Sequence, residues 1–454
     1  MCGIAGMLSM TDRPIERPEL VRAMMDRLVH RGPDESGEYV SPRRQAVLGH
    51  RRLRIIDLSS GRQPLTNEDG TVVVSFNGEI YDFQPMVAAL SARGHRFATR
   101  TDTEVIVHLY EEQGAACLAQ LNGMLAVALW DDRTGTLLLA RDRMGKKPLY
   151  YAVVNGVLAF ASELHALTAM PGLSRELDDR ALDLCLTLGY IPAPYTIYRD
   201  VRKLPAGHAL SVKAGQPGAL VPFRYDTDPP SGVEPLGWED AKQALIARLR
   251  AATQARMVSD VPLGCFLSGG VDSSTVLSFM AELSSQPVKT FSIGFPQEEF
   301  SELRYARTVA RHFGTEHHEY VLEPEGIDIL DQLVEHFGEP FADSSALPTW
   351  YLSKLTRKSV TVALTGDGGD ELFGGYDWYR TAQRLSTLAR LMPPGLGAAL
   401  GPWRQHGPRL IRKIAKAAAF AGYPEGWRFA RQREILSPEL KANLYEPAFA
   451  ARVG

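Results

Sequence analysis

Apolar residues in the first half of the chain recur mostly at every second position, which is the spacing of strands with one buried face. The opening run Gly3 to Met7 predicts a short buried strand, and Val72 to Phe76 is rich in β-branched residues. The other strands expected from this pattern cover residues 47–57, 125–130, 136–140, 150–154 and 157–161. Helical spacing is found at residues 19–29, 84–94, 179–188 and in a helix that opens at Thr101–Glu104. A strand-rich region with few long helices predicts a layered α+β sandwich.

The second half of the chain changes to strands that alternate with helices. Strands are expected at residues 261–267, 289–295, 319–322 and 360–364, and helices at 239–257, 275–283, 301–313 and 326–337. This alternation predicts an α/β, doubly wound parallel sheet, whose ligands lie beyond the carboxyl ends of its strands. The stretch from Asp226 to Gly232 is rich in Pro and Gly and is the best candidate for a linker between the halves.

Composition narrows the class of protein without changing the fold. The chain has 454 residues, of which 45% are hydrophobic, so it can bury a sizeable core, and its length suggests two or three domains. A net charge of −3 without long blocks of like charge argues against a nucleic-acid surface. The four cysteines lack CxxC spacing, which argues against a zinc site and a disulfide framework. With neither a bilayer-length apolar run nor a secretory signal, a reducing cytoplasm is the expected location.

Cys2 is the first candidate for catalysis. It follows the initiator Met directly, so removal of Met1 would place a thiol and a free α-amine on one residue. The thiolate is the nucleophilic form, and an α-amine that titrates near ~8 can serve as its base. The alternative is an accidental Cys at a frayed terminus, but the apolar run that follows argues for an ordered strand.

Three further positions in the first half have both a functional and a plain structural interpretation. An Arg within a buried strand needs a partner, so Arg52 is expected to face a cleft and meet a carboxylate, whereas Arg51 and Arg54 fit solvent-facing positions. Asn77-Gly78 supplies donors suited to an oxyanion, but on its own this dipeptide favours a hairpin turn. Asp102 is suited to hold a substrate amine group, but either Thr101 or Asp102 also fits a plain helix N-cap.

A serine- and glycine-rich loop follows the first strand of the second half. Residues 268–274 form a strand–glycine turn–helix pattern, which surrounds an anion with backbone N–H groups and a helix N-terminus. The loop contains no Lys, so it is not the GxxxxGK[ST] nucleotide loop. Asp272 is suited to carry Mg²⁺ bound to phosphates.

A second loop concentrates carboxylates at the end of the last predicted strand. Residues 365–371 contain three glycines and three acids, a costly arrangement unless a cation is present, because close carboxylates raise one another's pKa. Mg²⁺ bridging a pyrophosphate is the natural cation for such a loop.

In combination these motifs resemble one family. The sequence resembles the glutamine-dependent asparagine synthetases, in which a class II (N-terminal nucleophile) amidotransferase is fused to a PP-loop ATP pyrophosphatase domain. The glutaminase half is matched by Cys2-Gly3-Ile4, His30–Asp34, Arg52-Leu53, Asn77-Gly78-Glu79, Asp102 and Arg141–Tyr151, and the synthetase half by Ser268–Ser274 and Leu364–Tyr376. The chain is also similar to amidotransferases of bacterial polysaccharide gene clusters. The resemblance implies a glutamine amidotransferase domain at residues 2–212, a linker at 213–237 and an ATP-binding domain at 238–454.

The resemblance also implies a role for each matched residue. Cys2 attacks the glutamine amide, with Asn77 and Gly78 as the oxyanion hole, and ammonia passes through an internal channel to an adenylated carboxylate, giving amide, AMP and pyrophosphate. Glutamine binding is implied for Arg52, Leu53, Ile55, Asn77, Gly78, Glu79 and Asp102. ATP binding is implied for Phe266, Leu267, Ser268, Gly269, Gly270, Asp272, Ser273, Ser274, Ile293, Thr365 and Gly366. Asp272 and Asp370 are implied as Mg²⁺ ligands, and Asp367 as the acidic residue near the acyl-adenylate.

Two departures from the family pattern keep alternatives open. Arg54 stands where many members carry a small polar residue, and the family continues past Gly454 into a segment that completes the acceptor side. The leading interpretation is a cytoplasmic aspartate-to-asparagine ligase that uses glutamine, ATP and Mg²⁺. The alternatives are the same chemistry on another carboxylate, or a truncated glutaminase or nucleotide-binding protein without ligase activity. Neither nucleic acid nor a membrane span is expected, and a homodimer is the assembly to test.

Overall fold

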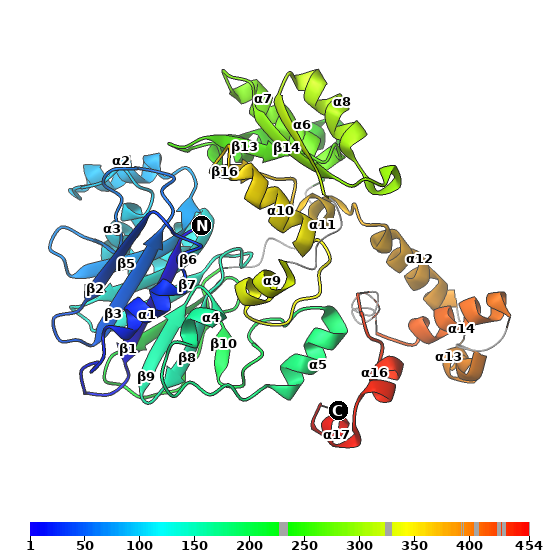
Figure 1. Ribbon diagram of the computed structural model, residues 1–454, viewed down its shortest axis with the longest axis horizontal. Coiled ribbons are helices and arrows are strands. Elements are labelled where there is room, and N and C mark those ends of the chain that lie inside the picture. The colour runs from blue at the N-terminus through cyan, green and yellow to red at the C-terminus, as the bar shows by residue number, and fades with distance from the viewer. Residues whose placement is uncertain are drawn as a thin grey trace.

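The computed structural model describes residues 1–226, 235–322, 329–391, 393, 395–403, 408–424, 428 and 433–453. Within these residues the first half forms two stacked six-stranded antiparallel sheets, drawn in blue to green at the left of Figure 1. One sheet has the order β10-β8-β9-β1-β3-β2 and the other β12-β11-β7-β6-β5-β4. The first sheet comprises β1 (Gly3–Ser9), β2 (Glu35–Val40), β3 (Ala46–Arg52), β8 (Tyr150–Val154), β9 (Val157–Ala161) and β10 (Val201–Lys203). The second comprises β4 (Leu65–Thr66), β5 (Val72–Ile80), β6 (Gly123–Asp131), β7 (Thr136–Arg141), β11 (His208–Lys213) and β12 (Phe223–Arg224).

Alternation along the strands builds three hydrophobic layers. In β1, Ile4 and Leu8 point into the core between the sheets, whereas Ala5 and Met7 point to the opposite face. That outer face is covered by α1 (Leu20–Asp26), α4 (Leu164–Leu167) and α5 (Asp179–Leu188). The outer face of the second sheet is covered by α2 (Gln84–Ala92) and α3 (Glu104–Gln113). The predicted α+β sandwich is confirmed as a helix–sheet–sheet–helix arrangement.

The turn predicted at Asn77-Gly78 is wrong. β5 continues through this dipeptide to Ile80 and pairs with β6 along its whole length, from Val72 opposite Asp131 to Ile80 opposite Gly123. Strand pairing overrides the local turn preference. The two strands also approach each other closely here, since a Cβ on Gly78 would lie 2.1 Å from the carbonyl oxygen of Met124 on the paired strand. Gly78 is thus required by a close strand approach.

The second half contains a parallel sheet of order β15-β14-β13-β16, as the alternation predicted, at the top of Figure 1. Its strands are β13 (Leu263–Phe266), β14 (Lys289–Gly294), β15 (Glu316–Val321) and β16 (Val362–Leu364). The helices beside it are α6 (Trp238–Ala255), α7 (Val271–Leu283), α8 (Leu303–Phe313) and α10 (Ala346–Thr356). Its small core includes Cys265, Leu277 and Ala306 from β13, α7 and α8. The predicted α/β class is confirmed.

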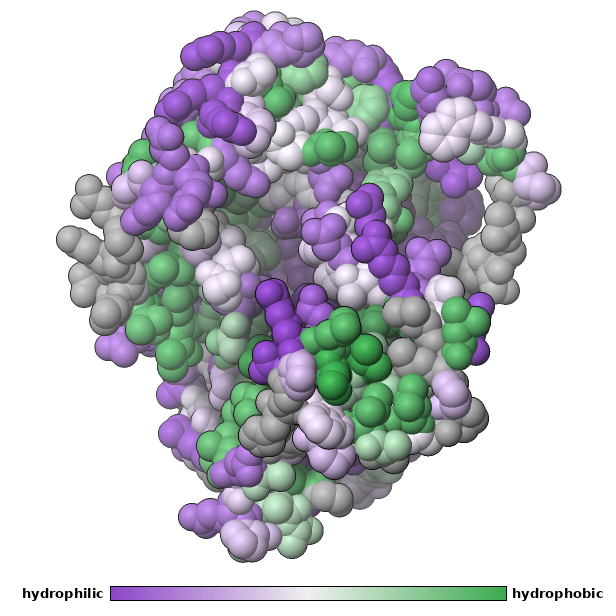
Figure 2. Space-filling view, turned by 90° about the vertical axis from the view of Figure 1, so that its right-hand side faces the viewer, coloured by the Kyte–Doolittle hydropathy of each residue, from purple (hydrophilic) through white to green (hydrophobic). Residues whose placement is uncertain are grey.

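Short helices follow the sheet. They are α11 (Gly369–Phe373), α12 (Asp377–Leu391), α13 (Leu396–Ala399), α14 (Arg409–Ala421), α16 (Pro438–Leu444) and α17 (Pro447–Val453), while α9 (Leu330–Phe337) precedes α10. Figure 2 views the molecule from the side of the C-terminal helices and shows hydrophobic side chains on a hollowed face. Leu391, Leu410, Leu440 and Leu444 are among the exposed apolar residues of these helices. None of the described helices is long and apolar enough to cross a bilayer.

The two halves touch through specific polar contacts. The Asp260 carboxylate accepts a hydrogen bond from the backbone N–H of Asp57, at 2.8 Å, and Lys203 forms an ion pair with Glu339. The guanidinium of Arg256 lies 4.1 Å from the ring centre of Tyr81. The predicted linker lies partly outside the described residues, at 227–234, and the domain boundaries at 212 and 238 remain predictions.

Candidate active site

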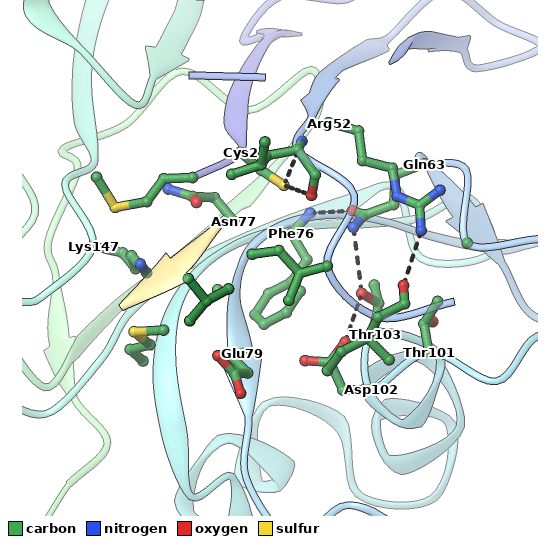
Figure 3. Close-up of a pocket in the computed structure, with 18 of the residues that line it drawn as sticks. Cys2, Arg52, Gln63, Phe76, Asn77, Glu79, Thr101, Asp102, Thr103 and Lys147 are labelled. Atoms are coloured by element: carbon green, nitrogen blue, oxygen red, sulfur yellow. Dashed lines mark hydrogen bonds between the residues drawn. The ribbon is translucent and has the colours of Figure 1, made fainter. Parts of the chain in front are cut away.

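A cavity of about 250 Å³ lies where the first sandwich meets the start of β16 (Figure 3). It is lined by all the residues expected to bind or attack glutamine, namely Cys2, Arg52, Leu53, Ile55, Asn77, Gly78, Glu79 and Asp102. Met1, Gln63, Lys147 and residues 361–363 of the second half also line it. The structure therefore brings together predicted site residues that lie up to 100 positions apart, from Cys2 to Asp102.

Cys2 directly precedes β1, a central strand of the first sheet. Its Sγ is 3.5 Å from the backbone nitrogen of Leu53, and Arg31 donates from Nε to the Cys2 carbonyl oxygen at 2.9 Å. Arg31 is held in turn by Glu163, 2.8 Å from its Nη1. Burial raises the pKa of the Cys2 thiol, so the thiol form is favoured in the chain that retains Met1. Burial also lowers the pKa of the Met1 α-amine to about 5, so this amine is largely neutral at pH 7.

Asn77 presents a buried amide to this cavity. Its side chain is 1% exposed, and its Nδ2 has no hydrogen-bond partner among the described residues. In Figure 3 the Asn77 amide lies beside Cys2. A buried N–H group without an acceptor is costly, which indicates that a ligand oxygen is meant to occupy this position. The arrangement is suited to stabilising negative charge on a carbonyl oxygen attacked by Cys2.

The expectation that Arg52 meets a carboxylate is confirmed. Its Nη1 lies 2.7 Å from Glu35, and its Nη2 donates to the carbonyl oxygens of Ile56 and Asp57. Arg54 is solvent-facing as predicted, with 42% of its side chain exposed, but it also forms an ion pair. β3 ends at Arg52, and Arg54 turns back to contact the other oxygen of Glu35 at 2.6 Å. The two guanidinium groups, with the Arg54 hydrogen bond the largest contribution, lower the pKa of Glu35 to about 2.

Arg51 is likewise not simply a solvent-facing residue. Its side chain is only 17% exposed, and its guanidinium contacts the carboxylate of Asp26 at the end of α1. The alternation along β3 therefore identifies the buried Arg52 correctly, but it overestimates the exposure of its neighbour.

Glu79 and Asp102 form the acidic end of the cavity. Burial first, and the nearby Asp102 carboxylate second, raise the pKa of Glu79 to about 7. Burial raises the pKa of Asp102 to about 6, although its Oδ2 accepts a hydrogen bond from the Ile80 N–H at 2.8 Å. The predicted N-cap role of Thr101 or Asp102 is wrong, since α3 begins after Thr103 without a side-chain cap. A buried and a half-buried carboxylate with raised pKa values are suited to receive a cationic group.

Lys147 and Gln63 are cavity residues that the sequence analysis did not single out. The loop before Lys147 is folded around Asp142, whose carboxylate accepts from the N–H groups of Met144, Lys146 and Lys147. Burial first, and the charge of Arg31 second, lower the pKa of Lys147 to about 8. Gln63 accepts from the Phe76 N–H at 2.7 Å and so supports β5 beside Asn77. The sequence offered one clue to Lys147, because this residue lies within the stretch 141–151 that resembles the family. Nothing in the sequence pointed to Gln63.

The serine-glycine loop lies between β13 and α7, at the carboxyl end of the parallel sheet. Ser268 Oγ lies 3.0 Å from Ser273 Oγ and accepts from the Gly270 N–H at 3.1 Å. The buried Ser274 Oγ has no hydrogen-bond partner in the described part of the chain. Gly269 has φ +82°, and a Cβ there would lie 2.5 Å from the Ala306 nitrogen. The loop therefore combines a tight glycine turn with an unsatisfied hydroxyl at a helix N-terminus, which suits an anion.

The acidic loop after β16 contacts the serine-glycine loop. A Cβ on Gly366 would lie 2.7 Å from the Ser273 nitrogen, and one on Gly369 would lie 2.4 Å from the carboxyl carbon of Asp272. Burial, and then the charges of Asp370 and Glu371, raise the pKa of Asp272. The predicted pair Asp272 and Asp370 is thus close enough for electrostatic repulsion. Asp367 is exposed, and its backbone N–H bonds Thr365 Oγ1 at 3.2 Å.

The remaining residues expected to bind a nucleotide lie near this edge of the sheet. Phe266 ends β13, and Ser292, one position before Ile293 on β14, donates from its hydroxyl to the Leu267 carbonyl oxygen. The start of β16 reaches the first cavity, whereas its end carries Thr365 and the acidic loop. At ~3.3 Å per residue, Thr361 and Thr365 are about 13 Å apart.

Two known protein families match different parts of the chain. Residues 1–221 match a glutamine amidotransferase domain, and residues 244–449 match an asparagine synthase domain. The chain is 36% identical to a Bacillus subtilis glutamine-hydrolysing asparagine synthetase, over 91% of this chain and 66% of that protein. It is 34% identical to a Methanocaldococcus jannaschii protein that carries the name glutamine-hydrolysing asparagine synthetase 2, over 86% of this chain and 78% of that protein. It thus spans about two thirds of the length of several curated relatives.

A solved Bacillus subtilis glutamine phosphoribosylpyrophosphate amidotransferase is a more distant match. It is 14% identical with a TM-score of 0.38, and the match covers 78% of this chain and 93% of that one.

Proposed function

Because the chain belongs to the family of glutamine-hydrolysing asparagine synthetases, we propose that it hydrolyses glutamine at the Cys2 cavity and uses the ammonia to amidate aspartate. The observation that carries the first step is the buried amide nitrogen of Asn77 beside Cys2, for which the described residues supply no hydrogen-bond partner. The second step is supported by the two contacting loops at the carboxyl end of the parallel sheet. Cytoplasm is the proposed location, and a homodimer is the proposed assembly.

Glutamine hydrolysis uses the residues of the first cavity. Once Met1 is removed, the Cys2 α-amine accepts the thiol proton and Sγ attacks the side-chain amide carbon. Asn77 Nδ2 and the Gly78 N–H hold the oxyanion, and collapse releases ammonia and leaves a thioester that water hydrolyses to glutamate. The α-carboxylate end of glutamine is bound by Arg52, through the N–H groups that do not contact Glu35, Ile56 or Asp57. Leu53 and Ile55 bind the same end. Glu79 and Asp102 bind its ammonium group, whose charge offsets the repulsion between the two carboxylates.

ATP fits the loops of the second half. The Ser274 hydroxyl, which no described residue satisfies, and the α7 N-terminus suit the phosphates. The close carboxylates of Asp272 and Asp370 suit Mg²⁺. When bound, the ion neutralises charge on the phosphates. The loop residues Ser268, Gly269, Gly270 and Ser273 hold the phosphates, and Phe266, Leu267, Ile293, Thr365 and Gly366 line the nucleotide site. We assign Asp367 the role of the acidic residue beside the reacting acyl group. ATP adenylates the aspartate side-chain carboxylate with loss of pyrophosphate, and ammonia displaces AMP.

The position of β16 supports transfer of ammonia between the sites. Free ammonia is mostly protonated in neutral water, so transfer inside the protein keeps it nucleophilic. β16 connects the two sites directly, because its start lines the glutamine cavity and its end leads into the acidic loop.

Product analysis tests the whole proposal. The polypeptide, with Met1 removed, is incubated with glutamine, aspartate, ATP and Mg²⁺, and the products are measured by mass spectrometry. We expect glutamate, asparagine, AMP and pyrophosphate. Glutamate without asparagine or AMP would exclude the ligase reaction on aspartate and restrict the chain to a glutaminase or to another carboxylate acceptor. No glutamate would overturn the first step.

Glutamine binding should weaken as pH falls. Below pH about 7 Glu79 becomes protonated, and below about 6 Asp102 follows, so attraction for the ammonium group is lost in two steps. Calorimetry on the non-hydrolysing Cys2→Ala variant should show Kd rising up to ~10-fold per pH unit in this range. Glu79→Gln should remove the upper step and Asp102→Asn the lower one. A Kd that stays constant from pH 5.5 to 8.5 would contradict the assignment.

A further inference from the structure

Two histidines and two glutamates converge on the outer side of the second sheet, away from both sites above. Glu68 lies in the turn between β4 and β5, His95 follows α2, and His108 and Glu111 lie one turn apart on α3. One nitrogen or oxygen from each of the four lies within 4.8 Å of the others. We name this group the His95–His108 cluster.

The spacing of these atoms resembles a metal coordination shell. His108 Nδ1 lies 3.3 Å from Glu111 Oε2 and 3.5 Å from Glu68 Oε2. His95 Nδ1 lies 3.7 Å from Glu111 Oε2 and 3.8 Å from Glu68 Oε1. A tetrahedral ion with bonds of ~2.1 Å separates its ligand atoms by about 3.4 Å. The four histidine–glutamate separations of 3.3–3.8 Å are close to this value, and every pair in the cluster lies within 4.8 Å, so the side chains would have to draw together to surround one ion.

Each carboxylate of the cluster has one oxygen anchored by a hydrogen bond and the other close to His108, and the anchored Oε1 of Glu68 is also the atom that lies 3.8 Å from His95 Nδ1. Asn67 Nδ2 donates to Glu111 Oε1 at 2.7 Å, and the Arg96 N–H donates to Glu68 Oε1 at 2.8 Å. The Oε2 atoms remain turned toward His108. Anchoring of this kind fixes the direction in which a ligating oxygen points.

Both histidines direct their second ring nitrogen at a further carboxylate. His95 Nε2 lies 3.3 Å from Glu112, which Arg93 contacts at 2.8 Å. His108 is 1% exposed, and its Nε2 faces Glu104 Oε1 at 3.7 Å without any hydrogen-bond partner among the residues described. A carboxylate hydrogen-bonded to the second ring nitrogen is the usual support of a metal-bound histidine. Glu112 gives this support to His95, whereas Glu104 faces His108 Nε2 from beyond hydrogen-bond distance.

Charge balance also favours a cation. Glu68, Glu104 and Glu111 surround His108 and outnumber its single available positive charge. The rings of His95 and His108 lie 4.8 Å apart, so a single divalent ion held by both would balance the charge of these carboxylates.

We propose that the His95–His108 cluster binds a divalent transition-metal ion, of which Zn²⁺ best matches two imidazole nitrogens with two carboxylate oxygens. Four protein ligands leave no open position, so the ion is structural. It ties the β4–β5 turn and the α2–α3 connection to α3, which begins two residues after Asp102. Scattered cysteines argued against a zinc site in the sequence, but this site contains none.

Zinc titration tests the proposal on the full chain. The Cys2→Ala background prevents the cavity thiol from binding the metal, and excess Mg²⁺ occupies the acidic loops. We expect one equivalent of Zn²⁺ to bind by calorimetry, a rise in the unfolding temperature with added Zn²⁺, and a tetrahedral visible spectrum with Co²⁺. His95→Gln combined with His108→Gln should lower affinity more than ~100-fold and abolish that spectrum.

Two further variants keep the test decisive. Glu68→Gln changes the most exposed ligand and is least able to disturb folding, and it should still lower the Zn²⁺ affinity. His312→Gln removes an exposed histidine of α8 and should change nothing. Equal Zn²⁺ affinity in the parent, the double variant and Glu68→Gln would overturn the proposal, as would a parent chain that binds neither Zn²⁺ nor Co²⁺.

Discussion

Replacing Cys2 by Ala is expected to lower glutamine hydrolysis by at least about a thousandfold, because the variant lacks the atom that attacks the amide carbon. Glutamine should still bind, since the lining groups Arg52, Glu79 and Asp102 remain. Release of glutamate is the measurement for hydrolysis, and calorimetry measures binding.

The same variant separates the two proposed sites. With ammonium salts in place of glutamine, Cys2→Ala should form amide at the parental rate, because the loops at 268–274 and 365–371 are not altered. Cys185→Ala is the matched control, a buried cysteine of α5 whose Sγ lies 3.7 Å from the Pro340 carbonyl oxygen and outside the cavity. Equal losses of glutamine- and ammonia-dependent synthesis in Cys2→Ala would contradict the two-site arrangement.

Much of the fold follows from local pattern. The hairpin of β8 and β9 forms at the residues expected, since Asn155-Gly156 separates two apolar runs and nothing in the packing opposes the turn. The same dipeptide type at Asn77-Gly78 forms continuous strand instead. There the paired strand β6 supplies hydrogen bonds beyond the dipeptide as well as before it, a long-range fact that local preference does not contain.

The candidate site follows from the sequence to a smaller extent. Cys2, Arg52 and Asn77 were identified by residue type and by resemblance, and the structure places them in one cavity. Their proposed roles remain predictions. Lys147 was not identified because its burial depends on a loop folded around Asp142, and burial of a lysine is not visible in a sequence.

The His95–His108 cluster shows the same limit. Its residues belong to three separate segments that only the packing of α3 against β5 brings together. No regular spacing in the sequence marks the cluster.

Asn77→Ala is expected to lower kcat for glutamine hydrolysis by about 10²- to 10³-fold with little change in KM, because its amide is aimed at charge that exists only during the reaction. Asn77→Asp tests the donor directly. It preserves the size of the side chain but replaces the N–H group by an acceptor, so kcat should fall at least as far as in the Ala variant. Binding of glutamine to Cys2→Ala combined with Asn77→Ala provides the control for a structural effect on the cavity.

The distinction between kcat and KM decides the role of Asn77. If Asn77 only supported the cavity wall, both variants would weaken binding and leave turnover of bound glutamine nearly unchanged, which would contradict an oxyanion role. A fall in kcat with binding preserved requires a donor that acts after Sγ has attacked. The buried Nδ2, which lacks a partner in the described residues, is positioned for that step, and its desolvation cost is offset only when the oxyanion forms.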